Sequence, residues 1–94
     1  SRGLGDVYKR QDINPVAPVH FLVVPKAHID NVNAVTAENS KYVARIFEKI
    51  PEIAKNEGIE SYRVISNCGE DAGQSVMHLH FHVVGGVKMG EKIL

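Results

Sequence analysis

Apolar positions along the chain fall into three short runs that predict strands. Residues 19–24 (VHFLVV) are β-branched and aromatic and stand between two prolines, which is typical of a buried strand. Residues 62–66 (YRVIS) form a second run, and residues 76–84 (VMHLHFHVV) form a third that ends at a pair of glycines. A polar, glycine-bearing loop joins the second and third runs, so we expect them to pair as antiparallel strands.

Between the first two runs, apolar residues recur at helical spacing and charged residues occupy the other positions, which predicts an amphipathic helix over residues 37–57. Thr36 is the expected N-cap, and Gly58 stands where a helix commonly ends. Because Pro51 lies inside this helix and has no N–H donor, we expect a kink or a break near residues 47–50. The fold class predicted is α+β, with one main helix packed on a small antiparallel sheet.

Composition narrows the range of functions. The 94 residues carry 11 basic and 11 acidic side chains, so the chain lacks the charge that nucleic acid or anionic lipid would attract. No stretch is apolar for long enough to span a membrane. A single cysteine, Cys68, cannot form an internal disulfide, and a cytoplasmic location is the default expectation. A chain this short buries a modest core, which favours association into an oligomer.

Residues 1–11 (SRGLGDVYKRQ) differ from the rest because they hold two glycines and four charges and show neither helical nor strand periodicity. The string DVYKRQ is also what the codons GAT-GTG-TAT-AAG-AGA-CAG encode, a sequence that resembles the transposase mosaic end used to build sequencing libraries. We therefore interpret residues 1–11 as a non-native, translated adapter, and the alternative is an ordinary disordered tail. On this interpretation the domain comprises residues 12–94, begins natively at Asp12 and lacks its N-terminal helix and first strands.

The third run places histidines at every other position. Alternate residues of a strand share a face, so His78, His80 and His82 are expected to line one side, about 6.5–7 Å apart along the strand. The intervening apolar residues are then expected to point into the helix-covered core; these are Leu79, Phe81 and Val83.

Two kinds of chemistry suit such a row. Two alternate histidines can bind one zinc ion with a third ligand from elsewhere, such as His20 or His28. Alternatively, an imidazole nitrogen can attack phosphorus and form a covalent phospho-imidazole intermediate. The middle position, His80, is the natural nucleophile because it has a neighbour on each side.

The loop that precedes the row can hold a phosphate. Gly69, Gly73 and the run 74–76 (QSV) offer backbone N–H groups with hydroxyl and amide donors beside the histidines. Donors of this kind stabilise the negative charge that develops on non-bridging oxygens. By itself, the loop is equally consistent with a plain hairpin connection.

These residues together resemble a known motif. GQSVMHLHFHVVGG is similar to the His-x-His-x-His motif of the histidine triad superfamily, and its flanks look like the histidine-triad nucleotide-binding (Hint) branch. The upstream stretch DINPVAPVHFLVVPKAHI is similar to a second block of that branch. The resemblance covers residue 12 to about residue 89, whereas the segment before Asp12 does not match.

The resemblance implies a role for individual residues. His80 corresponds to the nucleophile, and His78 and His82 to its flanking pair. His20 corresponds to a fourth histidine that contacts the first member of the triad, which here is His78. Ser75 is implied to relay a proton with His82 to the leaving group. The implied nucleotide-binding residues are Asp12 at the ribose hydroxyls, Ile13 and Leu22 at the purine, and Asn67, Gly73, Ser75 and Val76 with His80 and His82 around the phosphate.

The implied reaction is hydrolysis or nucleotidyl transfer at the α-phosphate of a nucleoside 5′-phosphoramidate or acyl-nucleotide, through a nucleotidyl-histidine intermediate. The resemblance implies a purine nucleotide such as AMP or GMP as ligand, no metal or other cofactor, and a homodimer whose sheet continues across the interface. Two alternatives remain: a zinc-binding module that uses the histidine row, and a nucleotide-binding interaction protein without turnover.

Overall fold

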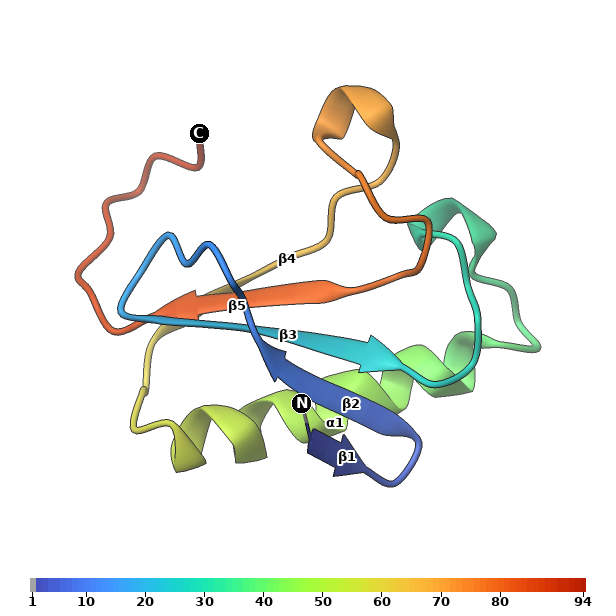
Figure 1. Ribbon diagram of the computed structural model, residues 1–94, viewed down its shortest axis with the longest axis horizontal. Helices are drawn as coiled ribbons and strands as arrows, with labels where there is room; N and C mark the ends of the chain where they lie inside the picture. The colour runs from blue at the N-terminus through green and yellow to red at the C-terminus, as the bar shows by residue number, and fades with distance from the viewer. Residues whose placement is uncertain (1) are drawn as a thin grey trace.

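The computed structural model describes residues 2–94 and shows an antiparallel sheet with one long helix on one of its faces (Figure 1). The strands are β1 (Arg2–Leu4), β2 (Val7–Gln11), β3 (Val19–Pro25), β4 (Tyr62–Ile65) and β5 (Phe81–Gly85), and they lie in the order β1-β2-β3-β5-β4. The helix is α1 (Ser40–Asn56), and two short 3₁₀ helices are η1 (Val32–Ala34) and η2 (Glu70–Ala72). The predicted α+β class is confirmed.

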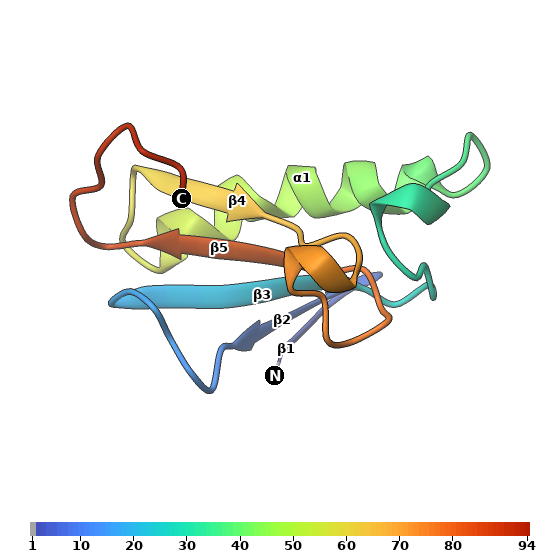
Figure 2. The same ribbon diagram turned by 90° about the horizontal axis from the view of Figure 1, so that it is seen from above.

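The hydrophobic core lies between the sheet and α1, which runs along one face of the strands in Figure 2. Alternate residues of β3 and β5 point toward the helix and are almost fully buried, because they share one face of the pleat. The central members are Phe21, Val23, Leu79, Phe81 and Val83 from the sheet side and Ile46, Ile50 and Ile53 from α1. The opposite face of β3 and β5, which carries the histidines, is not covered by α1.

The predicted helix begins three residues later than expected. Asn39 is the N-cap residue, and Thr36 instead stabilises the turn before it, where each of the two side chains accepts a hydrogen bond from the other's backbone N–H. The helix continues through Pro51 without the predicted break, although Pro51 donates no hydrogen bond. At the C-terminus, Gly58 adopts φ +77° as predicted. There the next N–H bonds to the carbonyl of Ala54 in a Schellman motif.

The strand predicted at residues 76–84 begins only at Phe81, so this prediction is wrong for its first half. Both neighbouring strands end here: β3 ends at Pro25, which has no N–H, and β4 ends at Ile65. The chain before Phe81 therefore bonds to loop groups, and the N–H of Leu79 donates to the carbonyl of Ile29. The predicted antiparallel pairing of β4 with β5 is confirmed.

The alternative of a disordered tail at residues 1–11 is wrong for residues 2–4 and 7–11, which form β1 and β2, and β2 pairs with β3 along its length. Val7 is completely buried in the core. Lys9 reaches past Phe21 to an ion pair with Glu57 at the end of α1. Because only Val7 of this strand is buried and the residues after it are partly or fully exposed, the strand shows no clear periodicity in the sequence. Ser1 lies outside the described residues, and the adapter origin of the segment stays a prediction.

Among the described residues, no helix has both the length and the apolar character needed to cross a membrane.

Candidate active site

Three polar side chains converge on the helix-free face of the sheet. In the register of β3 with β5, His20 lies opposite Val84 and Leu22 opposite His82, so His20 and His82 are diagonal neighbours on one face. His20 Nε2 lies 2.9 Å from His82 Nδ1. Asp12 Oδ2 lies 3.4 Å from His20 Nε2 and 3.8 Å from His82 Nδ1.

This geometry corrects one expectation. His20 was expected to contact His78, the first histidine of the row, but it contacts His82, the last one. The reason is the antiparallel pairing: His20 is near the start of β3, where the end of β5 lies, whereas His78 lies beside Pro25 at the end of β3. A sequence alone does not fix this register.

The ring of the middle histidine is held by a backbone carbonyl two residues before it. His80 Nδ1 lies 2.7 Å from the carbonyl oxygen of His78. A carbonyl oxygen accepts only, so Nδ1 carries the proton and Nε2 of neutral His80 presents its lone pair. An imidazole with a free Nε2 lone pair can act as a nucleophile.

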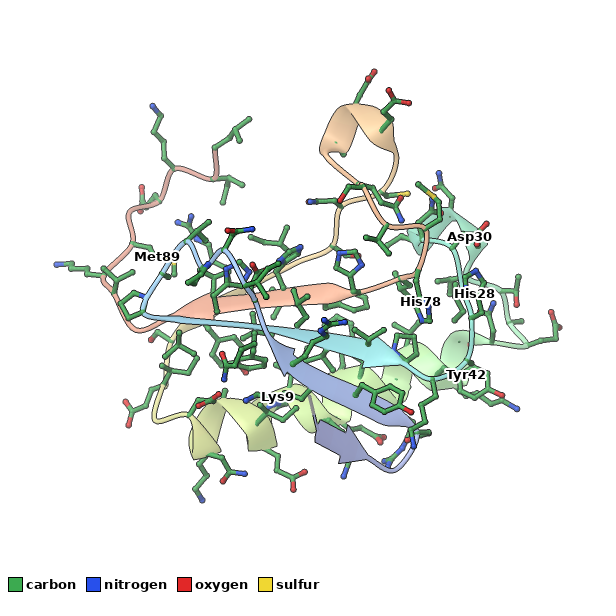
Figure 3. All side chains as sticks on the ribbon, viewed as in Figure 1. Lys9, His28, Asp30, Tyr42, His78 and Met89 are labelled. Atoms are coloured by element: carbon green, nitrogen blue, oxygen red, sulfur yellow. The ribbon has the colours of Figure 1, made fainter. Side chains whose placement is uncertain are left out.

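The first histidine is also held by the backbone. His78 Nε2 donates to the carbonyl oxygen of Pro25 at 2.9 Å. The ring of His28 stands edge-on to that of His78, with centroids 4.9 Å apart, and His28 Nε2 lies 2.8 Å from Asp30 Oδ1. Figure 3 shows these three residues side by side at one end of the sheet. His78 is therefore fixed far from His20, while the ring of His82 lies beside that of His80 at 5.2 Å.

A pocket of about 220 Å³ opens beside His78 and His80. Its other walls are mostly apolar: Arg10, Leu22, Val24 and Val76. Leu22 and Val76 thus lie where the sequence predicted binding residues. Ile13 is 88% exposed and is not part of this wall. Arg10 was missed because it belongs to the segment interpreted as non-native.

The loop before the row is organised by Gln74. Its side chain is 6% exposed and makes four hydrogen bonds. The amide nitrogen donates to the carbonyls of Asp30 and Val76, and the amide oxygen accepts from Asn31 Nδ2 and the N–H of Gly69. The expectation that this amide is a donor for phosphate is therefore corrected, because both of its ends are used within the loop.

The other loop residues named by the sequence stay near the surface. Gly73 has φ +86° at the end of η2, a conformation that side chains with a Cβ rarely adopt, and a Cβ there would lie 3.7 Å from Asn67 Nδ2. Ser75 and Val76 are exposed. These groups are thus accessible to a ligand that binds at the histidine row.

Burial and neighbouring imidazoles keep His82 neutral. Partial burial lowers the pKa of His82 below its ordinary value of 6.5, His80 and His20 lower it further, and the carboxylate of Asp12 raises it. The side chain of His82 is 20% exposed, so it still reaches solvent. His82 is consequently a neutral hydrogen-bonding group near physiological pH.

The side chains that could hold a metal ion differ from those the sequence suggested. The zinc hypothesis uses His78 and His80 with His20 or His28, but the structure places one ligand atom each of Asp12, His20 and His82 within 4.8 Å of one another. The set therefore combines only one member of the row with two residues from β3 and the chain before it.

The fold and the site define a small α+β protein whose antiparallel sheet presents an imidazole with a free Nε2 lone pair beside a pocket. A family model of the HIT domain matches residues 4–89, and this chain belongs to the HIT domain family. The match begins before Asp12, which corrects the expectation that residues 1–11 fall outside the resemblance.

Relatives and solved structures agree with this assignment. The purine nucleoside phosphoramidase of Escherichia coli K12 is 40% identical over 82 residues, which cover 85% of this chain and 69% of that protein. HitA of Neisseria gonorrhoeae is 38% identical over 82 residues, with 86% and 77% covered. The structure of a HIT family hydrolase from Clostridium thermocellum superimposes with a TM-score of 0.94 at 45% identity and covers 99% of this chain and 83% of its own. These relatives support hydrolase activity in general.

Proposed function

We propose that this protein hydrolyses nucleoside 5′-phosphoramidates or related acyl-nucleotides, with a purine nucleoside preferred, through a nucleotidyl-His80 intermediate. The observation that carries the proposal is the 2.7 Å contact between His80 Nδ1 and the carbonyl of His78, which leaves the Nε2 lone pair free. The similarity to the E. coli protein named purine nucleoside phosphoramidase supports the substrate class.

In the proposed first step, His80 Nε2 attacks the α-phosphorus and the P–N bond to the amine breaks. The amine leaves only when protonated, and we assign the proton relay to Ser75 and His82. In the second step, water attacks the phosphorus of nucleotidyl-His80 and passes a proton back to the Ser75–His82 relay, which restores the proton lost to the amine. The nucleoside monophosphate is released and the electron pair returns to Nε2. Another acceptor in place of water would give nucleotidyl transfer.

We assign the nucleotide-binding residues as follows. Leu22 and Val76 line the pocket, whose mostly apolar wall suits a purine. We assign the exposed Ile13 to the same role. Asp12 is assigned to the ribose hydroxyls, since a carboxylate accepts from both hydroxyls of a diol. We assign the phosphate oxygens and the leaving group to four loop residues: Asn67, Gly73, Ser75 and the N–H of Val76.

A fluorogenic adenosine 5′-phosphoramidate tests the proposal. We expect turnover by the full chain, resistance to a chelator and a nucleotidyl adduct in the wild-type protein by rapid-quench mass spectrometry. His80→Ala is expected to abolish both turnover and adduct, whereas His28→Ala, which removes an exposed imidazole outside the row, keeps the adduct.

Other outcomes separate the alternatives. Turnover that a chelator abolishes and zinc restores overturns the proposal in favour of zinc chemistry. Saturable AMP binding without turnover shows a nucleotide-binding protein that is not an enzyme. Turnover by His80→Ala equal to that of the wild type excludes His80 as the nucleophile.

We also propose that the chain forms a homodimer with a sheet that continues across the interface. Of the described strands, β4 lies at one edge of the sheet, and Ile65 near its end is 42% exposed. Such an edge carries unpaired backbone groups that a second copy can pair. Light scattering coupled to size-exclusion chromatography measures the mass, and a monomer at high micromolar concentration contradicts this assignment.

A further inference from the structure

The starting point is a backbone N–H that points at a buried histidine. The N–H of Val16 donates to His20 Nδ1 at 3.1 Å, and His20 is 6% exposed. A peptide nitrogen always carries its hydrogen, so His20 Nδ1 must accept through its lone pair. The proton of neutral His20 therefore lies on Nε2.

The position of that proton determines the tautomer of His82. His20 Nε2 lies 2.9 Å from His82 Nδ1, so the Nε2–H of His20 donates to His82 Nδ1. His82 Nδ1 then holds a lone pair, and neutral His82 carries its proton on Nε2. The chain of donors runs in one direction, from Val16 through His20 to His82.

Asp12 would favour the opposite arrangement if His20 were absent. Its Oδ2 atom lies 3.8 Å from His82 Nδ1, and a carboxylate at this position attracts a proton to Nδ1. In the structure, His20 Nε2 also lies 3.4 Å from Asp12 Oδ2, but its hydrogen bond goes to His82 Nδ1. By donating to His82 Nδ1, His20 blocks the Nδ1–H form of His82.

We propose that His20 is a positioning residue that holds His82 in the tautomer with its proton on Nε2. Two neighbouring imidazoles of the row then have opposite tautomers. His80 presents a lone pair from Nε2, and His82, with its ring 5.2 Å away, presents an N–H. The first suits attack on phosphorus, and the second suits donation into the proton relay that we assign to Ser75 and His82.

The same relay acts against a metal ion bound by Asp12, His20 and His82. Metal-bound nitrogen needs a lone pair, whereas His20 Nε2 carries the proton. Moving that proton to Nδ1 would direct two N–H groups, that of His20 and that of Val16, at each other. The hydrogen bonds from Val16 to His20 and from His20 to His82 therefore fix the ring tautomers and oppose metal binding.

Long-range ¹H–¹⁵N correlation spectra of the full chain test the tautomers directly, because a ring nitrogen with a proton is distinguished from one without. At mildly alkaline pH we expect His82 to be protonated on Nε2 and His80 on Nδ1. In His20→Leu, which keeps an apolar side chain of similar size in the buried position, we expect the proton of His82 to move to Nδ1, facing Asp12.

His20→Gln is the matched control. Its amide oxygen can accept from Val16 and its amide nitrogen can donate to His82, as the two ring nitrogens do. We expect this variant to keep His82 protonated on Nε2 and to lose less than about tenfold in kcat. His20→Leu is expected to lose about 10²-fold in kcat, the lower end of what a positioned general acid or base typically contributes. Thermal unfolding of both variants checks that the fold is retained.

The effect on kcat rests on the proposed function, whereas the tautomers do not. If the wild type shows no turnover, the spectra still decide the role of His20. A wild-type His82 with its proton on Nδ1 overturns the inference, as does a His20→Leu variant in which His82 stays protonated on Nε2. Equal losses of kcat in the two variants with an unchanged His82 tautomer show that His20 is merely structural.

Discussion

Replacing Gln74 with leucine removes a buried amide that holds three segments together. Its side chain bonds to the loop at Asp30 and Asn31, to Gly69 at the start of η2, and to Val76 before the histidine row. A typical hydrogen bond contributes about 0.5–1.5 kcal/mol net, so four bonds set a range of about 2–6 kcal/mol. Water can reach several of these partners in the loop, and we therefore expect Gln74→Leu to lose about 2–4 kcal/mol of unfolding free energy.

Urea denaturation at fixed protein concentration measures this loss from the shift of the midpoint at constant slope. Glu70→Ala is the control, since Glu70 is an exposed residue of the same loop, and we expect it to change stability by less than about 0.5 kcal/mol. A loss below about 1 kcal/mol in Gln74→Leu would refute the idea that this amide organises the loop. A changed slope would instead point to an altered unfolded or native state.

Three further predictions follow from single side chains. Pro51→Ala restores a helical N–H and is expected to stabilise the chain by about 1–3 kcal/mol in thermal unfolding, and an unchanged midpoint contradicts this. Asp12→Asn removes the charge that raises the pKa of His82, so NMR titration should show that pKa lowered further, where a rise would contradict the assignment. Because the folded pKa is the lower one, the contribution of His82 to stability is complete above pH 6.5 and is lost as the pH falls through the folded pKa. Gly85→Ala places a Cβ 2.9 Å from a backbone oxygen and should cost about 1–3 kcal/mol, whereas Gly90→Ala, which meets nothing within 4 Å, should cost little.

The sequence predicted the parts of the fold that depend on local pattern. The continuous apolar run at β3, a central strand, and the helical spacing of α1, which buries one face, are both visible in the sequence. β2 was missed because only Val7 of its five residues is buried. The start of β5 was predicted too early because side chains continue to alternate between buried and exposed through residues 78–80, where the partner strands have already ended.

The candidate site was predictable as a set of residues but not as a set of contacts. The spacing of the row identifies three histidines, whereas the pairing of His20 with His82 depends on strand register between distant segments. The four hydrogen bonds of Gln74 likewise join loops far apart in the chain, and a glutamine in a polar loop gives no sign of them. Long-range register and loop packing are properties of the folded chain.

The late start of β5 has a consequence for anyone who would transplant this row into another scaffold. Inside a central strand, the carbonyl of residue 78 would belong to the ladder with a neighbouring strand. Here the strand has not yet begun, and the carbonyl of His78 is free to accept from the ring of His80. Three alternate histidines on a regular, fully paired sheet would keep the spacing but lose this acceptor. Neither tautomer of the middle ring would then be favoured by the backbone.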